Sequence, residues 1–168
     1  MKVCSVFLLV VLIGQVATAS VWASKRMKMD ERLTQEIEVV LSLTAEFHKE
    51  RVNKAEEEAQ KTALNLAKKL VEVKSLSEKI HDVQSVHITK ILDSAYSSLK
   101  NYNDNPKAAD AIGGLKDFFK EIVQITQVFD VKKYKIFFCP LDRALWLQKD
   151  SKAQNPINLK FMNCGKPV

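Results

Sequence analysis

Apolar side chains recur every three or four residues through most of the chain between positions 30 and 130. In the first stretch they are Leu33, Ile37, Val40, Thr44 and Phe47. This spacing places them along one stripe of an α-helix that begins near Asp30. Similar stripes follow on Ala59, Ala63, Leu66 and Leu70, then on Ile80, Val83, His87, Ile91, Ala95 and Leu99, and last on Ala108, Ile112, Leu115, Phe119, Ile122, Thr126 and Phe129. The pattern predicts amphipathic helices.

The boundaries between these helices have weaker signals. Asn53 and Ser75 each precede a glutamate by three residues, a spacing that is typical of a helix N-cap, and we expect breaks there. Neither glycine nor proline occurs in residues 24–105. One uninterrupted coiled coil over residues 30–100 is therefore the alternative.

A clearer boundary lies at residues 101–106, where three asparagines and one aspartate precede Pro106. We expect Asn105 to cap the last helix and Pro106 to occupy its first position. None of these helices buries its apolar stripe alone. The prediction for residues 20–130 is therefore an all-α fold, an antiparallel bundle of about four helices.

Residues 131–168 do not continue the helical spacing, and we expect them to form a basic, aromatic segment that packs on the bundle. Residues 136–140 are a short β-prone run that ends in proline. Residues 141–148 are compatible with a short helix, and residues 149–156 are polar and rich in turn residues.

The N-terminal residues predict a secretory signal peptide. Lys2 precedes an uncharged apolar run, Val3–Ile13, which is too short to span the ~30 Å hydrocarbon core of a bilayer. Small residues mark two candidate cleavage sites, after Ala19 and after Ala23. We expect residues 1–19 to be removed and the protein to be secreted. The alternative, an N-terminal membrane anchor, requires roughly 18 or more apolar residues, and no other apolar run of that length follows.

Loss of the signal peptide also removes Cys4 and leaves two cysteines, Cys139 and Cys164. An even pair in an oxidising compartment predicts a disulfide. In the chain-entropy model, a bridge that closes a loop of about 25 residues stabilises the fold by roughly 3 kcal/mol.

The positive charge lies near the C-terminus. Residues 131–168 contain 8 basic and 2 acidic residues, a net charge of +6, whereas residues 20–130 contain 17 basic and 18 acidic residues, a net charge of −1. Arginine and aromatic residues dominate binding energy at protein interfaces. A disulfide that fixes this segment would also lower the free-energy cost of ordering it on binding. The candidate partner-binding residues are Lys132, Lys133, Lys135, Arg143, Trp146, Lys149, Lys152 and Lys160. The alternative for the aromatic residues is that they close the end of the bundle.

Catalytic and metal-binding patterns are missing from the sequence. His81 and His87 are about 120° apart on a helix, so they do not form a metal pair. His87 falls on an apolar stripe, which favours a core histidine. The sequence contains neither a nucleophile elbow nor a glycine-rich phosphate loop. We expect no enzymatic activity, no cofactor, no metal and no specific nucleic-acid binding.

A signal peptide, a helical body of mixed charge and a basic aromatic segment bounded by Cys139 and Cys164 resemble the small salivary proteins of blood-feeding mosquitoes, in particular the anophensin group. The likeness covers the whole chain and lies in its architecture, so no functional residues carry over. It implies a salivary inhibitor of host haemostasis or complement, through kallikrein and factor XII of contact activation or through the alternative pathway.

Three functions are compatible with these features. The first is a secreted, non-enzymatic antagonist that binds an extracellular protein or a polyanionic surface. The second is a carrier of a small apolar ligand, held in the bundle between Phe47, Phe118, Phe119 and Phe129. The third is a self-associating coiled-coil structural protein.

Overall fold

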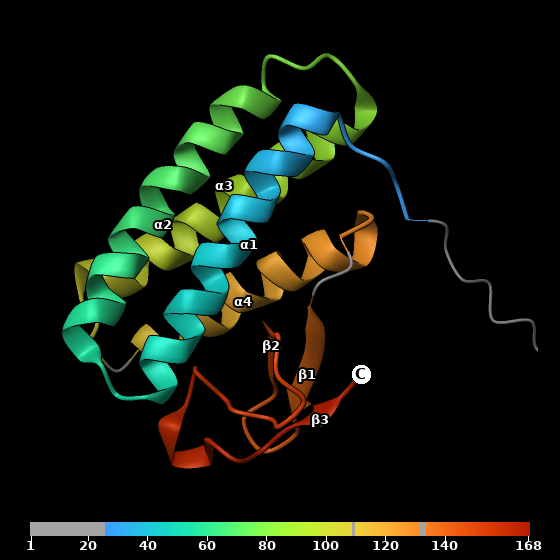
Figure 1. Cartoon of the computed structure of the whole chain (residues 1–168). Helices are drawn as coiled ribbons and strands as arrows, with labels where there is room; N and C mark the ends of the chain where they lie inside the picture. The colour runs from blue at the N-terminus through green and yellow to red at the C-terminus, as the bar shows by residue number, and fades with distance from the viewer. Residues whose placement is uncertain (1–25, 109, 132–133) are drawn as a thin grey trace, which may run out of the picture.

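Four helices precede a small antiparallel sheet in the computed structural model, which describes residues 26–108, 110–131 and 134–168 (Figure 1). The elements are α1 (Glu31–Val52), α2 (Glu56–Ser77), α3 (Val83–Asp104), α4 (Ala111–Val128), β1 (Lys135–Cys139), β2 (Ala144–Gln148), a 3-10 turn η1 (Leu159–Phe161) and β3 (Lys166–Pro167). The mainly helical prediction is confirmed. The all-α class is corrected, because the C-terminal segment forms a three-stranded sheet. The predicted signal peptide lies outside the described residues.

Helix α1 begins where the sequence predicts. The side chain of Asp30 accepts a hydrogen bond of 3.1 Å from the backbone N–H of Leu33 and so satisfies one of the free amides of the first turn. The predicted stripes of α1 and α2 are all buried: Leu33, Ile37, Val40, Thr44 and Phe47, and then Ala59, Ala63, Leu66 and Leu70. These faces form the centre of the core.

The helix breaks lie close to the predicted positions, but their caps differ. Asn53 ends α1 instead of starting α2, and Lys54 follows in the left-handed conformation with φ 59°. The N–H of Ala55 then bonds to the carbonyl of Glu50 at 2.9 Å, as in a Schellman motif. Glycine is usual at such a position and marks the end of a helix in a sequence. The lysine here does not, so the sequence does not indicate this helix end.

The second break was predicted too early. Helix α2 continues through Ser75, and Asp82 caps α3 by accepting a hydrogen bond of 2.6 Å from the N–H of Ser85. Both breaks reverse the chain, so the long coiled coil is excluded (Figure 1).

The later helix start changes the buried face of the first turn of α3. Val83 is 82% exposed and His87 is exposed, which corrects their assignment to the apolar stripe. Ser85 and Ile88 take the buried positions instead, and the predicted core positions Ile91, Ala95 and Leu99 follow. His87 is therefore a surface residue, with its ring centroid 6.3 Å from that of Phe129.

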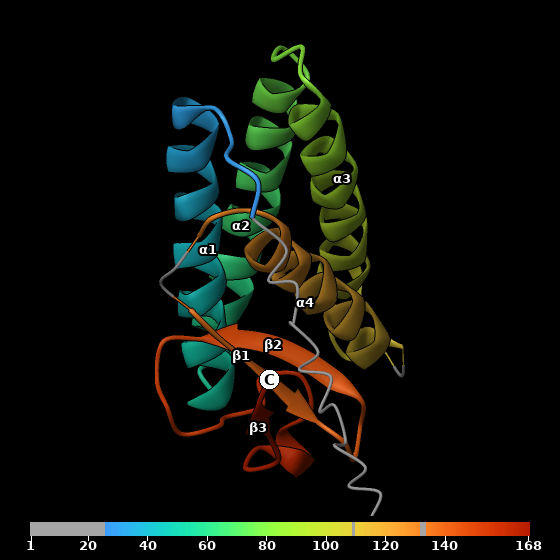
Figure 2. The same ribbon diagram turned by 90° about the vertical axis from the view of Figure 1, so that its right-hand side faces the viewer.

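Helix α4 begins at Ala111, so the predicted start at Asn105 and Pro106 is also too early. Ile112 is consequently exposed, although the predicted positions from Leu115 onward are buried. Figure 2 shows α4 crossing obliquely in front of the roughly parallel axes of α1, α2 and α3. Gly114 permits a close approach to α3, because a Cβ atom there would lie 3.0 Å from the carbonyl oxygen of Ser98.

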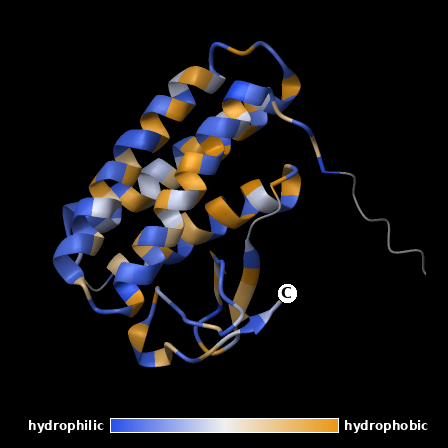
Figure 3. Ribbon diagram, in the orientation of Figure 1, coloured by the Kyte–Doolittle hydropathy of each residue, from blue (hydrophilic) through white to orange (hydrophobic). Residues whose placement is uncertain are grey.

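The sheet lies beneath the helices with the strand order β2-β1-β3. Strand β1 confirms the predicted β-prone run, whereas β2 replaces the helix predicted for residues 141–148. Phe137 of β1 lies opposite Trp146 of β2. Because side chains alternate along a strand, Leu145 and Leu147 occupy the other face of β2, the strand that contacts α4 and α1. Figure 3 shows the largely apolar α4 above this sheet.

Candidate binding surface on the C-terminal segment

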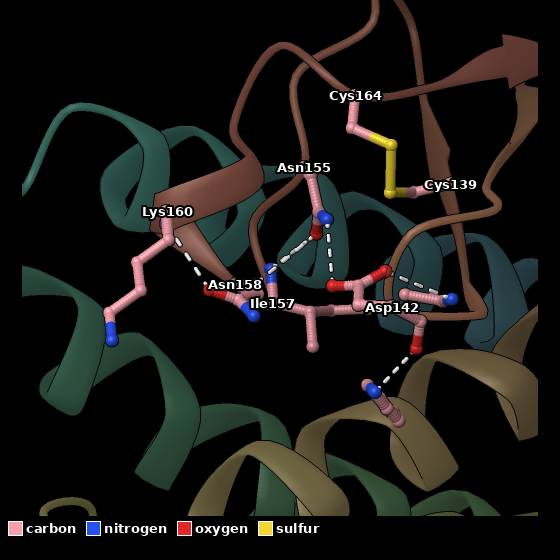
Figure 4. The surroundings of a disulfide bond; sticks show 9 residues. Cys139, Asp142, Asn155, Ile157, Asn158, Lys160 and Cys164 are labelled. Carbon is pink, nitrogen blue, oxygen red and sulfur yellow. Dashed lines mark hydrogen bonds between the residues drawn. A yellow bond between two sulfur atoms is a disulfide. The ribbon is translucent and has the colours of Figure 1, made fainter.

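The disulfide predicted between Cys139 and Cys164 is present, with a Cα–Cα distance of 5.2 Å. It joins the end of β1 to the segment that leads into β3, as Figure 4 shows beside the loop that contains Asn155. The loops after β2 are thereby tied to the sheet at their far end.

Trp146 lies in the interior, which removes it from the candidate contact residues. Its side chain is 0% exposed, and its ring stacks on that of Phe137 with the centroids 5.9 Å apart. The backbone of Gly165 covers the indole so closely that a Cβ atom there would lie 2.6 Å from the Cη2 atom of Trp146. Trp146 and Phe137 are therefore interior residues that pack inside the C-terminal segment.

A single buried amide holds the loop after β2. The Nε2 atom of Gln148 donates to the carbonyl oxygens of Asp150 and Lys152 at 3.0 and 2.7 Å. Its Oε1 atom accepts from Trp146 Nε1 at 2.8 Å and from the N–H of Gln154 at 3.1 Å. With these bonds the buried amide is fully satisfied, and it fixes the backbone that carries Lys149 and Lys152.

A second polar network holds the next loop to the β1–β2 turn (Figure 4). Asn155 Nδ2 donates to Asp142 Oδ2 at 3.1 Å, and Asn155 Oδ1 accepts from the N–H of Ile157 at 3.0 Å. Asp142 Oδ1 accepts from the N–H of Ala144 at 3.2 Å. The carboxylate of Asp142 is therefore committed to internal hydrogen bonds.

Two side chains of α1 bind the same segment from the helical side. His48 Nε2 donates to the carbonyl oxygen of Gln154 at 2.7 Å, and Arg51 Nε donates to that of Pro156 at 3.1 Å. Burial lowers the pKa of His48, although the hydrogen bond to Gln154 and the charge of Asp150 oppose this shift. Burial between α1 and the C-terminal segment thus favours the neutral form of this histidine.

The described cations of this segment form two groups. We call Lys135, Lys149 and Lys152 the α1-side cluster; all three are exposed. The Nζ atom of Lys135 donates to Ser151 Oγ, which places Lys135 beside the loop that holds the other two. Lys149 Nζ lies 5.8 Å from the centroid of the Tyr134 ring. Lys132 and Lys133 lie outside the described residues.

The second group is the distal cluster, formed by Arg143, Lys160 and Lys166, which are also exposed. In the β1–β2 hairpin, Lys135 pairs with Gln148 at one end and Cys139 pairs with Ala144 at the other. These pairs are four residue steps apart, about 13 Å along the strands. The structure therefore divides the single basic surface that the sequence predicts.

Lys166 was not among the predicted site residues. It belongs to the distal cluster because β3 pairs with β1, with Lys166 opposite Phe138. The sequence could have indicated this, because Lys166 follows Cys164 by two residues and the predicted disulfide brings Cys164 to the end of β1.

A groove separates α1 from the C-terminal segment. It consists of two cavities, of about 370 and 440 Å³, which share Ser42 and Lys149 in their lining. Three carboxylates, those of Glu38, Glu46 and Asp150, also line it. Burial and the charge of Glu38 raise the pKa of Tyr134, which lines the wider cavity. The groove has mixed charge, unlike the α1-side cluster at its edge.

The interior between the helices is occupied by aromatic rings. Phe47, Phe118, Phe119 and Phe129 are all 0% exposed. The centroid of Phe47 lies 6.4 Å from that of Phe118 and 6.2 Å from that of Phe119, and Phe118 and Phe119 are 5.2 Å apart. The rings of Phe47, Phe118 and Phe119 thus pack against one another where the carrier hypothesis places an apolar ligand.

Among the described residues, no group of three or more histidine, cysteine or acidic side chains is arranged to hold a metal ion. The helices of this part of the chain include none that is long and apolar enough to cross a membrane.

Comparisons of the chain with protein-family models, with curated proteins and with solved structures find no match. The function is therefore inferred from the residues and their arrangement.

Proposed function

We propose that this is a secreted, non-enzymatic binding protein that docks on an acidic protein partner through the α1-side cluster. The observation that carries the proposal is that Lys135, Lys149 and Lys152 are exposed on a fixed backbone. They are exposed on a segment whose backbone is fixed by the amide of Gln148 and by the disulfide.

These cations are available to a partner. The lysine ion pairs of the described residues involve Lys61, Lys69, Lys74 and Lys100, all of which lie in α2 and α3. Lys135 and Lys152 form none of them, so an acidic partner would not displace an internal carboxylate. Complementary charge accelerates association and selects the partner.

The rigidity of the segment supports high affinity. Binding costs free energy whenever a loop or a flexible side chain must be ordered. Gln148 and His48 already fix the loop at residues 150–154 from two sides. The cost that remains is mainly that of ordering the three lysine side chains.

The resemblance to mosquito salivary proteins names the first partners to test. On this proposal, the protein occupies a basic-ligand site on kallikrein, on factor XII or on a component of the alternative complement pathway, and prevents assembly. Such blocking needs a binding surface and no catalytic group.

The test compares two triple variants of equal charge change. Lys135→Glu, Lys149→Glu and Lys152→Glu together reverse the cluster, whereas Lys90→Glu, Lys107→Glu and Lys120→Glu together reverse three exposed lysines of the helical body. Affinity for each immobilised plasma protein is measured at several salt concentrations. We expect the cluster variant to bind at least tenfold more weakly and the body variant to change by less than threefold.

Equal losses in both variants would show that net charge alone governs binding and would contradict the assignment to the cluster. Absence of binding to every plasma protein would contradict the assignment to these host systems.

A further inference from the structure

The far end of the C-terminal segment presents apolar side chains beside cations. Leu141 is 68% exposed, and Phe161 is 37% exposed. Each lies within two residues of a member of the distal cluster: Leu141 near Arg143, and Phe161 next to Lys160. The same pairing of an apolar residue with a cation thus occurs in two separate loops.

The fold gathers these two pairs at one end of the molecule. Leu141 follows Cys139 by two residues, and Phe161 is held to Cys164 by a backbone hydrogen bond of 2.8 Å. The disulfide joins the two cysteines, and Lys166 lies opposite Phe138, the residue before Cys139. In Figure 1, η1, β3 and the β1–β2 turn lie at the lower end, opposite the α2–α3 turn.

We infer that this end docks peripherally on a bilayer that contains anionic phospholipid. The three cations would contact lipid phosphates and carboxylates, and Leu141 and Phe161 would insert at the boundary between headgroups and acyl chains. Asp142 is the acidic residue nearest to these cations in sequence, and neutral donors of Ala144 and Asn155 bind its carboxylate. Three cations against this one carboxylate leave the named side chains with a net positive charge.

A lipid surface fits this end better than a folded protein does. Protein anchors are typically aromatic side chains buried in a concave pocket. The two cavities of the groove lie along α1, and none of the five residues of this end lines them. A fluid layer of headgroups adapts to two separate apolar side chains without a shaped pocket.

The distal end and the α1-side cluster act separately. They are about 13 Å apart along the hairpin, more than a Debye length of about 8 Å at physiological salt. Bilayer binding at the distal end would leave Lys135, Lys149 and Lys152 free for a protein partner.

The experiment uses the disulfide-bonded protein purified from the medium of secreting cells. Co-sedimentation is measured with large vesicles of phosphatidylcholine alone and with vesicles that also contain 30% phosphatidylserine. We expect binding to the anionic vesicles only, at least tenfold weaker in the variant Leu141→Ser/Phe161→Ser. The matched control is Val83→Ser/Val86→Ser, which removes two exposed valines at the opposite end and should change binding by less than threefold.

Equal binding to both kinds of vesicle would overturn the inference. Charge-driven adsorption that is insensitive to Leu141→Ser/Phe161→Ser would also overturn it, as would binding to heparin without binding to vesicles. The α1-side variant of Lys135, Lys149 and Lys152 should keep vesicle binding within threefold, so failure here is distinguishable from failure of the proposed protein site.

Discussion

The imidazole of His48 bonds at 2.7 Å to the carbonyl oxygen of Gln154 and so joins α1 to the C-terminal segment. A carbonyl only accepts hydrogen bonds, so Nε2 carries the proton in the neutral ring. Because the same Nε2–H is present in the imidazolium, protonation at Nδ1 does not remove this bond. What protonation adds is a buried positive charge.

The first prediction concerns the pH dependence of stability. The pKa of His48 is lowered in the folded protein by burial, so the unfolded chain binds a proton more readily. The contribution of His48 to the free energy of unfolding should be constant above the unfolded pKa of about 6.5 and should fall as the pH drops below it. Urea denaturation of the wild type and of His48→Gln at pH 7.5, 6.5 and 5.5 measures this contribution of His48 to stability.

Glutamine can still donate to the carbonyl of Gln154 but does not titrate. We therefore expect the wild type to lose more stability than His48→Gln as the pH falls. A difference that is independent of pH would contradict a lowered pKa for His48.

The second prediction concerns Gly165, which lies against Trp146. A methyl group at this position would overlap the indole ring, which stacking on Phe137 prevents from moving away. Gly165→Ala should lower the free energy of unfolding by about 1–3 kcal/mol, as overpacking of a core usually does. Urea denaturation measures the change.

Gly113 provides the control for this substitution. A Cβ atom there meets nothing within 4 Å, and the residue lies in a helix. Gly113→Ala should be neutral or should stabilise the protein by up to about 1 kcal/mol. Stability losses of similar size at both glycines would show that the contact with Trp146 is not the cause.

The sequence predicted the first two helices well because their apolar residues repeat on one face. Asp30 adds a capping side chain at the start of α1, and the stripe from Leu33 to Phe47 is buried as expected. At the end of α1 the left-handed residue is Lys54. The propensity of a lysine does not reveal that conformation, which accompanies the Schellman hydrogen bond from Ala55 to Glu50.

Strand β2 shows why the C-terminal segment was harder to predict. Its residues are apolar on both faces, since Leu147 and Trp146 are both buried, so neither helical nor alternating polarity is visible. The aromatic and basic composition predicted a contact surface but did not separate buried Trp146 from the exposed lysines. The division into two clusters depends on the hairpin register and on the disulfide, which are long-range features.

The third prediction separates the two binding surfaces through the disulfide. Cys139→Ala/Cys164→Ala should lower the free energy of unfolding by roughly 3 kcal/mol, the entropy term for a loop of this length. The disulfide directly fixes the distal end, whereas Gln148 and His48 hold the loop of the α1-side cluster by their own hydrogen bonds. The variant should therefore lose vesicle binding at least tenfold while its affinity for an acidic protein partner falls by less than threefold.

Urea denaturation measures the first effect, and far-ultraviolet circular dichroism verifies that the helices remain folded under the binding conditions. Co-sedimentation and surface binding then compare the two affinities in the same preparation. Parallel losses at both surfaces, with the helices intact, would mean that the C-terminal segment loosens as one unit. The hydrogen bonds of Gln148 and His48 would in that case be too weak to hold Lys149 and Lys152 in place without the covalent bridge.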